Sequence, residues 1–187
     1  MISIGTLLGG YRTGYFPMEV NGDIRWFSPE RRGVIPLDEF KVSRRLARLI
    51  RQDRFRCTVN AAFRDVIQAC ASRPNTAGNW IDPEILESYC LLHRAGHAHS
   101  VEVWHEGRLA GGLYGVSLRG AFFGESMFHQ VRDASKVALS TLVGRLRHRG
   151  YVLLDVQWVT PHLEQFGAVE IARSLTLTRR GEGIELD

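Results

Sequence analysis

A helix that leads directly into an apolar strand, between Asp133 and Gln157, is the feature that most constrains the fold of this chain. Apolar side chains recur along the helix at the i, i+3, i+4, i+7 spacing of one buried face, namely Leu139, Leu142, Val143 and Leu146. Asp133 is suited to cap this helix and Gly150 to end it. The residues that follow, 151–157, have the apolar composition of a buried strand.

Three strand patterns joined by short turns precede this helix, at 100–104, 108–118 and 121–125. Strands so closely spaced predict an antiparallel meander. Earlier in the chain the apolar spacing predicts further helices, at 43–52, 60–72 and 82–96, with a short one within 1–15. The order of helices, meander, helix and strand therefore predicts an α+β fold, in which the last helix crosses over to a strand of the same sheet.

The composition is that of a soluble globular protein, with 187 residues, 44% hydrophobic and 24% charged. This length fits one domain, or one domain with a small appendage. The three cysteines form no CxxC pair and are odd in number, which argues against a disulfide framework and predicts a cytoplasmic setting. The chain has no apolar run of membrane-spanning length and no secretion signal pattern, so we expect no membrane association.

The strand at 151–157 carries polar side chains where packing favours apolar ones. Asp155 and Gln157 lie two residues apart and therefore point to the same face. A buried carboxylate costs free energy unless it meets a partner or a wet cleft. Glu125 has a similar setting, directly after the apolar end of the third meander strand. These residues either cap neighbouring loops or line the rim of an apolar pocket that could bind an ammonium group.

The sequence lacks the motifs of several enzyme classes. Two residues after Ser126 the chain has Phe128, where a hydrolase nucleophile elbow requires glycine. The chain has no glycine-rich phosphate loop. His97 and His99 have no third ligand at metal-binding spacing. We therefore expect no nucleotide hydrolysis, no metal and no cofactor.

Arginines crowd the helix predicted at 43–52, where they are Arg44, Arg45, Arg48 and Arg51. A solvated helix face explains such a cluster in most proteins. Because acidic residues are scarce around it, an anion-binding surface is the alternative.

Taken together, the motifs resemble the bacterial leucyl/phenylalanyl-tRNA–protein transferase family. The resemblance runs in order over nearly the whole chain, and each motif alone is weak while the ordered set is specific. The matching segments are Gly14–Pro17, Trp26–Pro29, Trp80–Ile81, Tyr89, Leu92–His93, Gly96–Trp104, Gly111–Gly115, Phe123–Phe128, Ala134–Lys136, Leu154–Gln157 and Gly167–Ala168.

The resemblance implies an N-acetyltransferase-like fold and an aminoacyl transfer. Leu or Phe would pass from Leu-tRNA or Phe-tRNA to the α-amine of a protein that begins with Arg or Lys, creating an N-end degradation signal. An aminoacyl ester is already activated, so no cofactor is implied, and we expect a monomer. The resemblance also implies two parts, a shortened N-terminal segment at 1–32 and the aminoacyltransferase domain at 33–187.

The resemblance assigns roles to individual residues. Glu125 would bind the α-ammonium of the transferred amino acid, and Asp155 and Gln157 would lie at the reacting centre. In one version Gln157 accepts the proton of the attacking amine, polarised by Asp155. Because an amide has almost no basicity, we favour the version in which Gln157 orients the amine and Asp155 favours its charge. The arginines Arg44, Arg45, Arg48 and Arg51 would meet acceptor-stem phosphates. The side-chain pocket would be lined by Trp80, Tyr89, Leu113 and Phe122, with Met18 where the family usually has tryptophan.

Two other functions compete with this one. An acyl-CoA N-acyltransferase on the same fold would need a glycine-containing pyrophosphate turn, whereas the stretch 130–135 has no glycine and its Asp133 would repel phosphate. A non-catalytic RNA-binding module is the other alternative, and the presence of Glu125, Asp155 and Gln157 argues against it.

Overall fold

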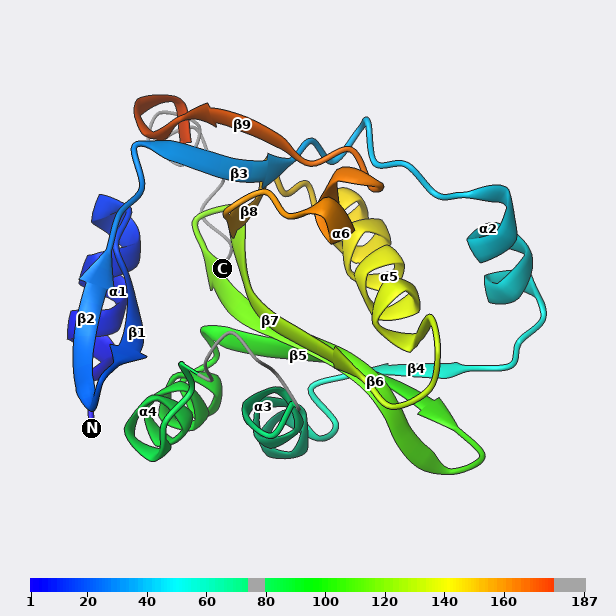
Figure 1. Cartoon of the computed structure of the whole chain (residues 1–187), viewed down its shortest axis with the longest axis horizontal. Helices are drawn as coiled ribbons and strands as arrows, with labels where there is room; N and C mark the ends of the chain where they lie inside the picture. The colour runs from blue at the N-terminus through cyan, green and yellow to red at the C-terminus, as the bar shows by residue number, and fades with distance from the viewer. Residues whose placement is uncertain (74–79, 177–187) are drawn as a thin grey trace.

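The computed structural model describes residues 1–73 and 80–176, and its centre is a seven-stranded sheet with helices on both faces (Figure 1). Its strand order is β4-β5-β6-β7-β8-β3-β9. Only β7 and β8 pair in parallel; the other neighbours in this order are antiparallel. The strands are β3 (Arg31–Ile35), β4 (Arg56–Val59), β5 (Ala98–His105), β6 (Arg108–Leu118), β7 (Ala121–His129), β8 (Leu153–Gln157) and β9 (Val169–Ala172).

The predicted α+β arrangement, with an antiparallel meander and a helix that crosses over to a strand of the same sheet, is confirmed. The strands β5, β6 and β7 form the meander, and α5 (Ala134–His148) crosses over from β7 to its parallel neighbour β8. Asp133 occupies the N-cap position of α5 with φ 68°, but its side chain turns to Arg45 instead of capping the helix.

Helices cover the two faces of the sheet and enclose two apolar cores (Figure 1). One core lies between the sheet and α3 (Phe63–Ala71) with α4 (Pro83–Arg94); the other lies under α5. Neighbouring residues of β8 divide between them, since Leu153 belongs to the first core and Leu154 to the second. Two shorter helices are α2 (Arg44–Arg51) and α6 (Pro161–Glu164).

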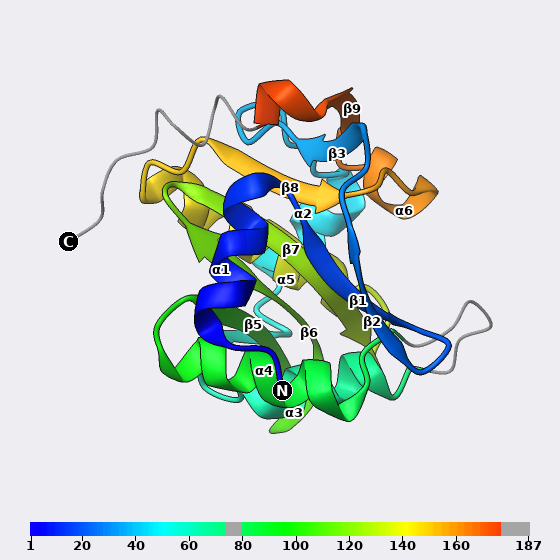
Figure 2. The same ribbon diagram turned by 90° about the vertical axis from the view of Figure 1, so that its left-hand side faces the viewer.

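The N-terminal residues form a helix and a hairpin at one end of the sheet, as Figure 2 shows. The helix α1 (Ile4–Thr13) lies beside the hairpin of β1 (Phe16–Val20) and β2 (Asp23–Phe27). At the turn of the hairpin, Asn21 and Gly22 both take positive φ, 56° and 89°, which is the turn geometry that joins two antiparallel strands tightly.

Contacts tie this N-terminal part to the rest of the chain. Within the N-terminal part, Trp26 of β2 lies directly over Gly10 of α1, where an added Cβ would come within 2.3 Å of the indole. The backbone N–H of Glu19 donates to the carbonyl of Trp80 over 3.1 Å. The division at residue 32 stays a prediction, and β3 begins at Arg31, inside the main sheet. Within the described residues, no helix is both long and apolar enough to cross a bilayer.

Candidate active site

The site lies where the parallel strands β7 and β8 diverge. Their pairing covers Ala121–Phe123 against Leu153–Asp155. Just beyond, β7 is bulged against β6, because Tyr114 pairs with Ser126 while Gly115 pairs with Gly124. Glu125 is the extra residue of this bulge, a device that redirects a side chain. Gly115 permits the bulge, since a Cβ there would lie 2.1 Å from the carbonyl oxygen of Phe123.

A cavity of about 670 Å³ opens between the two strands, within the size range of small-molecule sites. Met18 from the N-terminal hairpin and Trp80 lie on one part of its wall. Its apolar lining also includes Leu113, Met127, Leu139, Leu142, Leu154 and Val156. Glu125 and Gln157 are polar groups in this largely apolar wall. The cavity can therefore hold an apolar side chain beside a charged group.

Glu125 meets partners from three elements. Gln157 Nε2 donates to Glu125 Oε1 over 3.0 Å, and the Tyr89 hydroxyl donates to Oε2 over 3.4 Å. The Tyr11 hydroxyl in turn shares a short hydrogen bond with that of Tyr89. Burial raises the pKa of Glu125 to about 7, against the lowering effects of Tyr11, Arg32 and Tyr89. A carboxyl with this pKa changes charge near neutral pH.

Asp155 lies behind this wall in an ion pair with Arg32, and both side chains are fully buried. Arg32 Nε lies 2.9 Å from each carboxylate oxygen, and Nη1 donates to the Gly14 carbonyl over 2.9 Å. The backbone N–H of Gln157 donates to Asp155 Oδ1 over 2.9 Å. Gln157 has φ 61°, an unusual conformation for a residue with a side chain. The carboxylate thus supports the backbone turn from which the Gln157 amide reaches Glu125.

The residues expected to line the pocket lie in different places. Met18, Trp80 and Leu113 line the cavity. Tyr89 contributes through its hydroxyl, which reaches Glu125. Phe122 differs from the expectation: it is 3% exposed and lies in the core behind the wall, over Gly115. Its position on β7 explains this, because successive side chains alternate faces and Phe123 points into the other core.

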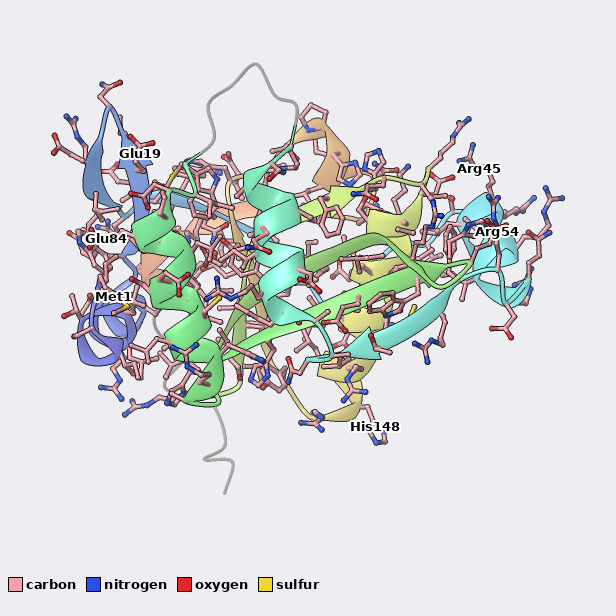
Figure 3. All side chains as sticks on the ribbon, turned by 90° about the horizontal axis from the view of Figure 1, so that it is seen from below. Met1, Glu19, Arg45, Arg54, Glu84 and His148 are labelled. Carbon is pink, nitrogen blue, oxygen red and sulfur yellow. The ribbon has the colours of Figure 1, made fainter. Side chains whose placement is uncertain are left out.

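The four arginines of α2 are all exposed. Arg45 pairs with Asp133 at the start of α5, and a smaller cavity of about 260 Å³ lies there, lined also by Arg48 and Arg132. Figure 3 places Arg45 at the opposite end of the view from Glu19 of the N-terminal hairpin. The arginines therefore form a cationic surface at the end of the molecule opposite to that hairpin.

Local sequence patterns do not single out three residues of this site, namely Arg32, Tyr11 and Trp158. Arg32 follows another arginine at the start of a short strand, and only its burial distinguishes the two. Trp158 lines the cavity beside Gln157 and is 43% exposed, with its ring edge-on to Phe16 at 5.1 Å between centroids. The Gly14-to-Pro17 motif was the available signal for Arg32, since the arginine binds its first residue.

Comparisons with known proteins show the family of the chain. The family model of leucyl/phenylalanyl-tRNA protein transferase matches residues 34–179, and that of the family's N-terminal domain matches residues 1–30. A leucyl/phenylalanyl-tRNA–protein transferase of Rhodopseudomonas palustris (strain TIE-1) is 55% identical over 176 residues, 92% of this chain and 78% of the relative. One of Chlorobaculum tepidum is 51% identical, covering 91% of this chain and 90% of the relative.

Solved structures show the fold alone. The structure of L-PGS from Bacillus licheniformis is similar with a TM-score of 0.51 and 12% identity, covering 86% of this chain and 67% of that one. The sequence matches extend over both the N-terminal part and the sheet that carries Glu125 and Gln157. This chain belongs to the leucyl/phenylalanyl-tRNA–protein transferase family of aminoacyltransferases.

Proposed function

We propose that this chain transfers Leu or Phe from its charged tRNA to the α-amine of proteins that begin with Arg or Lys. Family membership supports the reaction class. The observation that supports the location of the chemistry is the Gln157–Glu125 hydrogen bond at the mouth of the apolar cavity between β7 and β8. The product would carry a new N-terminal Leu or Phe that marks it for degradation.

Glu125 binds the α-ammonium group of the donor amino acid in this proposal. Its pKa of about 7 in the free site is a consequence of burial, and an ammonium beside it would favour the ionised form. The donor side chain then enters the apolar wall formed by Met127, Leu139 and Leu142. The cavity volume of about 670 Å³ suits an apolar side chain that is unbranched at Cβ, together with part of the terminal nucleoside.

Peptide-bond formation needs little chemical assistance at this site. The neutral acceptor amine attacks the ester carbonyl, a C–N bond forms, and the C–O bond to the terminal ribose breaks. The ribose hydroxyl leaves with a proton that its vicinal hydroxyl can relay from the amine. Holding the two reactants in line can contribute about 7–11 kcal/mol of the barrier.

Gln157 orients the attacking amine, because an amide is too weak a base to take its proton. Asp155 acts behind it. The Asp155 carboxylate already accepts hydrogen bonds from Arg32 and from the Gln157 backbone, which favours an electrostatic and positional role over that of a general base. Its negative charge would stabilise the positive charge that develops on the amine.

The arginines of α2 would bind acceptor-stem phosphates. Arg44, Arg45, Arg48 and Arg51 are exposed on one short helix, and phosphate contacts of this kind make affinity strongly dependent on salt. Recognition would then depend on the charged 3′ end and the backbone more than on base sequence. We further propose that the protein acts as a cytoplasmic monomer.

One transfer experiment separates this function from its two rivals. Purified protein is given leucyl-tRNA, phenylalanyl-tRNA or acetyl-CoA, with peptides that begin with Arg, Lys, Asp or Ala. We expect transfer from charged tRNA to the Arg and Lys peptides only. Transfer from acetyl-CoA would establish the acyl-CoA reaction instead, preference for the Asp peptide would change the acceptor class, and binding without any transfer would favour the RNA-binding module.

A further inference from the structure

We infer that Arg32 is a positioning residue of this site: its guanidinium holds the Asp155 carboxylate in place and offsets the negative charge that this carboxylate presents to Glu125. The inference rests on the proposed function, in which Glu125 must carry a negative charge to bind the donor ammonium. It adds a residue from the start of β3 to a centre otherwise built from β7 and β8.

The contacts of Arg32 are those of an anchored side chain. Nε bridges both oxygens of Asp155 at 2.9 Å, and the side chain is 0% exposed. Nη1 donates to the carbonyl of Gly14, which caps the end of α1. The guanidinium carbon lies 4.8 Å from the centre of the Phe16 ring, and Phe16 lines the cavity. One arginine thus connects the N-terminal helix and hairpin to the strand of the reacting centre.

Arg32 acts on Gln157 through Asp155. One of the two carboxylate oxygens that Arg32 contacts, Oδ1, also accepts the backbone N–H of Gln157. That hydrogen bond supports the left-handed backbone of Gln157, at φ 61°. Without the arginine, the carboxylate would be buried with an uncompensated charge, which strongly favours rearrangement. The direction of the Gln157 side chain toward Glu125 therefore depends on Arg32.

Charged and titratable groups face Glu125 from every element around it. Tyr11 comes from α1, Tyr89 from α4, Tyr114 from β6, Arg32 from β3 and Asp155 from β8. Among them Arg32 lowers the pKa of Glu125, whereas Asp155 raises it. Burial raises the pKa values of all three tyrosines well above their usual value, so the tyrosines stay neutral near pH 7. Besides burial and the Tyr11 hydrogen bond, Arg32 and Asp155 therefore act on the pKa of Glu125 in opposite directions.

The test measures the titration of Glu125 directly, by ¹³C NMR of carboxyl-labelled glutamate, with Glu125→Gln used to assign the signal. Arg32→Gln should raise the Glu125 pKa by roughly half a unit or more, less than the one to three units that a directly adjacent opposite charge produces. Asp155→Asn should lower the pKa, and the double variant should fall between the two single variants. Shifts of the same sign, or none in either single variant, would overturn the inference.

The kinetic readout separates positioning from a general loss of structure. In Arg32→Gln we expect the KM for the charged tRNA to rise near pH 7 and to recover at higher pH. Arg32→Lys, which keeps the charge, should retain the Glu125 pKa and lose part of kcat. A pH profile identical to that of the wild type would contradict the inference.

The controls use residues that the chain itself offers. Arg31 precedes Arg32 on the same strand, is 69% exposed and pairs with Glu170, so Arg31→Gln should leave titration and kinetics unchanged. If Arg32→Gln does not fold, the neutral pair in Arg32→Gln/Asp155→Asn removes the unpaired charge. Its Glu125 pKa must then exceed that of Asp155→Asn alone, and equality would overturn the inference. Because titration needs no turnover, failure here is distinct from absence of transfer by the wild type.

Discussion

The side-chain amide of Gln157 donates a hydrogen bond of 3.0 Å to Glu125 across the opening between β7 and β8. The two residues belong to parallel strands whose pairing has already ended at Phe123 and Asp155. The hydrogen bond therefore joins two side chains across a gap where the backbones of the two strands no longer pair. A donor that places its ammonium against Glu125 would bring its ester close to Gln157, where the acceptor amine is to be held.

Loss of the Glu125 charge should weaken donor binding. In Glu125→Gln we expect kcat/KM for charged tRNA to fall by roughly tenfold to a hundredfold, the scale of a hydrogen bond to a charged group of about 1.5–3 kcal/mol. Steady-state kinetics with leucyl-tRNA measures this. Glu87→Gln, which removes an exposed carboxylate paired with Arg64, should leave the value unchanged. Equal effects of the two substitutions would argue against a role for Glu125.

Glu125 should also make the protein less stable as the pH rises. Burial raises its pKa from 4.5 to about 7, so between these values the folded state binds more protons than the unfolded state. The free energy of unfolding then decreases with rising pH across this window. Urea unfolding at about pH 5 and about pH 8 should show that decrease in the wild type and a smaller one in Glu125→Gln.

A matched carboxylate gives the control for that measurement. The Arg64 hydrogen bond lowers the pKa of Glu87, so its contribution has the opposite sign. Glu87→Gln should therefore keep the decrease in stability seen in the wild type. If Glu125→Gln and the wild type respond identically to pH, Glu125 does not titrate as its burial indicates.

Charge reversal on α2 should weaken the binding of charged tRNA and leave the other steps unchanged. In Arg44→Glu/Arg48→Glu we expect a higher KM for charged tRNA, with kcat and the peptide KM preserved. Each lost phosphate contact should reduce the slope of log affinity against log salt by about one. Arg12→Glu/Arg94→Glu changes the net charge by the same amount, on exposed arginines of other helices. It should leave the KM for charged tRNA and the salt dependence unchanged.

The apolar wall should set the preference between Leu and Phe. Leu142 lines the cavity, so Leu142→Phe should reduce kcat/KM for phenylalanyl-tRNA more than for leucyl-tRNA, by roughly 10- to 200-fold in the ratio. Competition between the two charged tRNAs measures this ratio. Phe122→Leu alters a residue behind the wall, and it should reduce thermal stability without changing the preference.

Much of this architecture could be predicted from local patterns. The meander and the crossover helix follow from apolar periodicity and from turns such as Arg119–Gly120, both of which are local. Asp155, Gln157 and Glu125 could be selected because a polar side chain in an apolar strand requires a partner. The structure brings Gln157 and Glu125 into contact, while their catalytic roles stay predictions.

The remaining features depend on contacts between distant segments. Arg32 was not selected because its partner Asp155 lies on a strand far along the sequence. The side to which Phe122 points depends on the pairing of β7 with both neighbours and on the bulge at Glu125. The short strands β3 and β9 have too few residues for periodicity to identify them. Long-range register is therefore the information that local patterns lack.

The position of β3 between β8 and β9 has a consequence for how the protein is made. Synthesis releases β3 well before β8 and β9, the two strands that pair with it. Until then Arg32 has no Asp155 to bind and the edges of β3 have no partner, a state that favours misassociation. A nascent chain therefore cannot bring Gln157 against Glu125 before β8 has emerged from the ribosome.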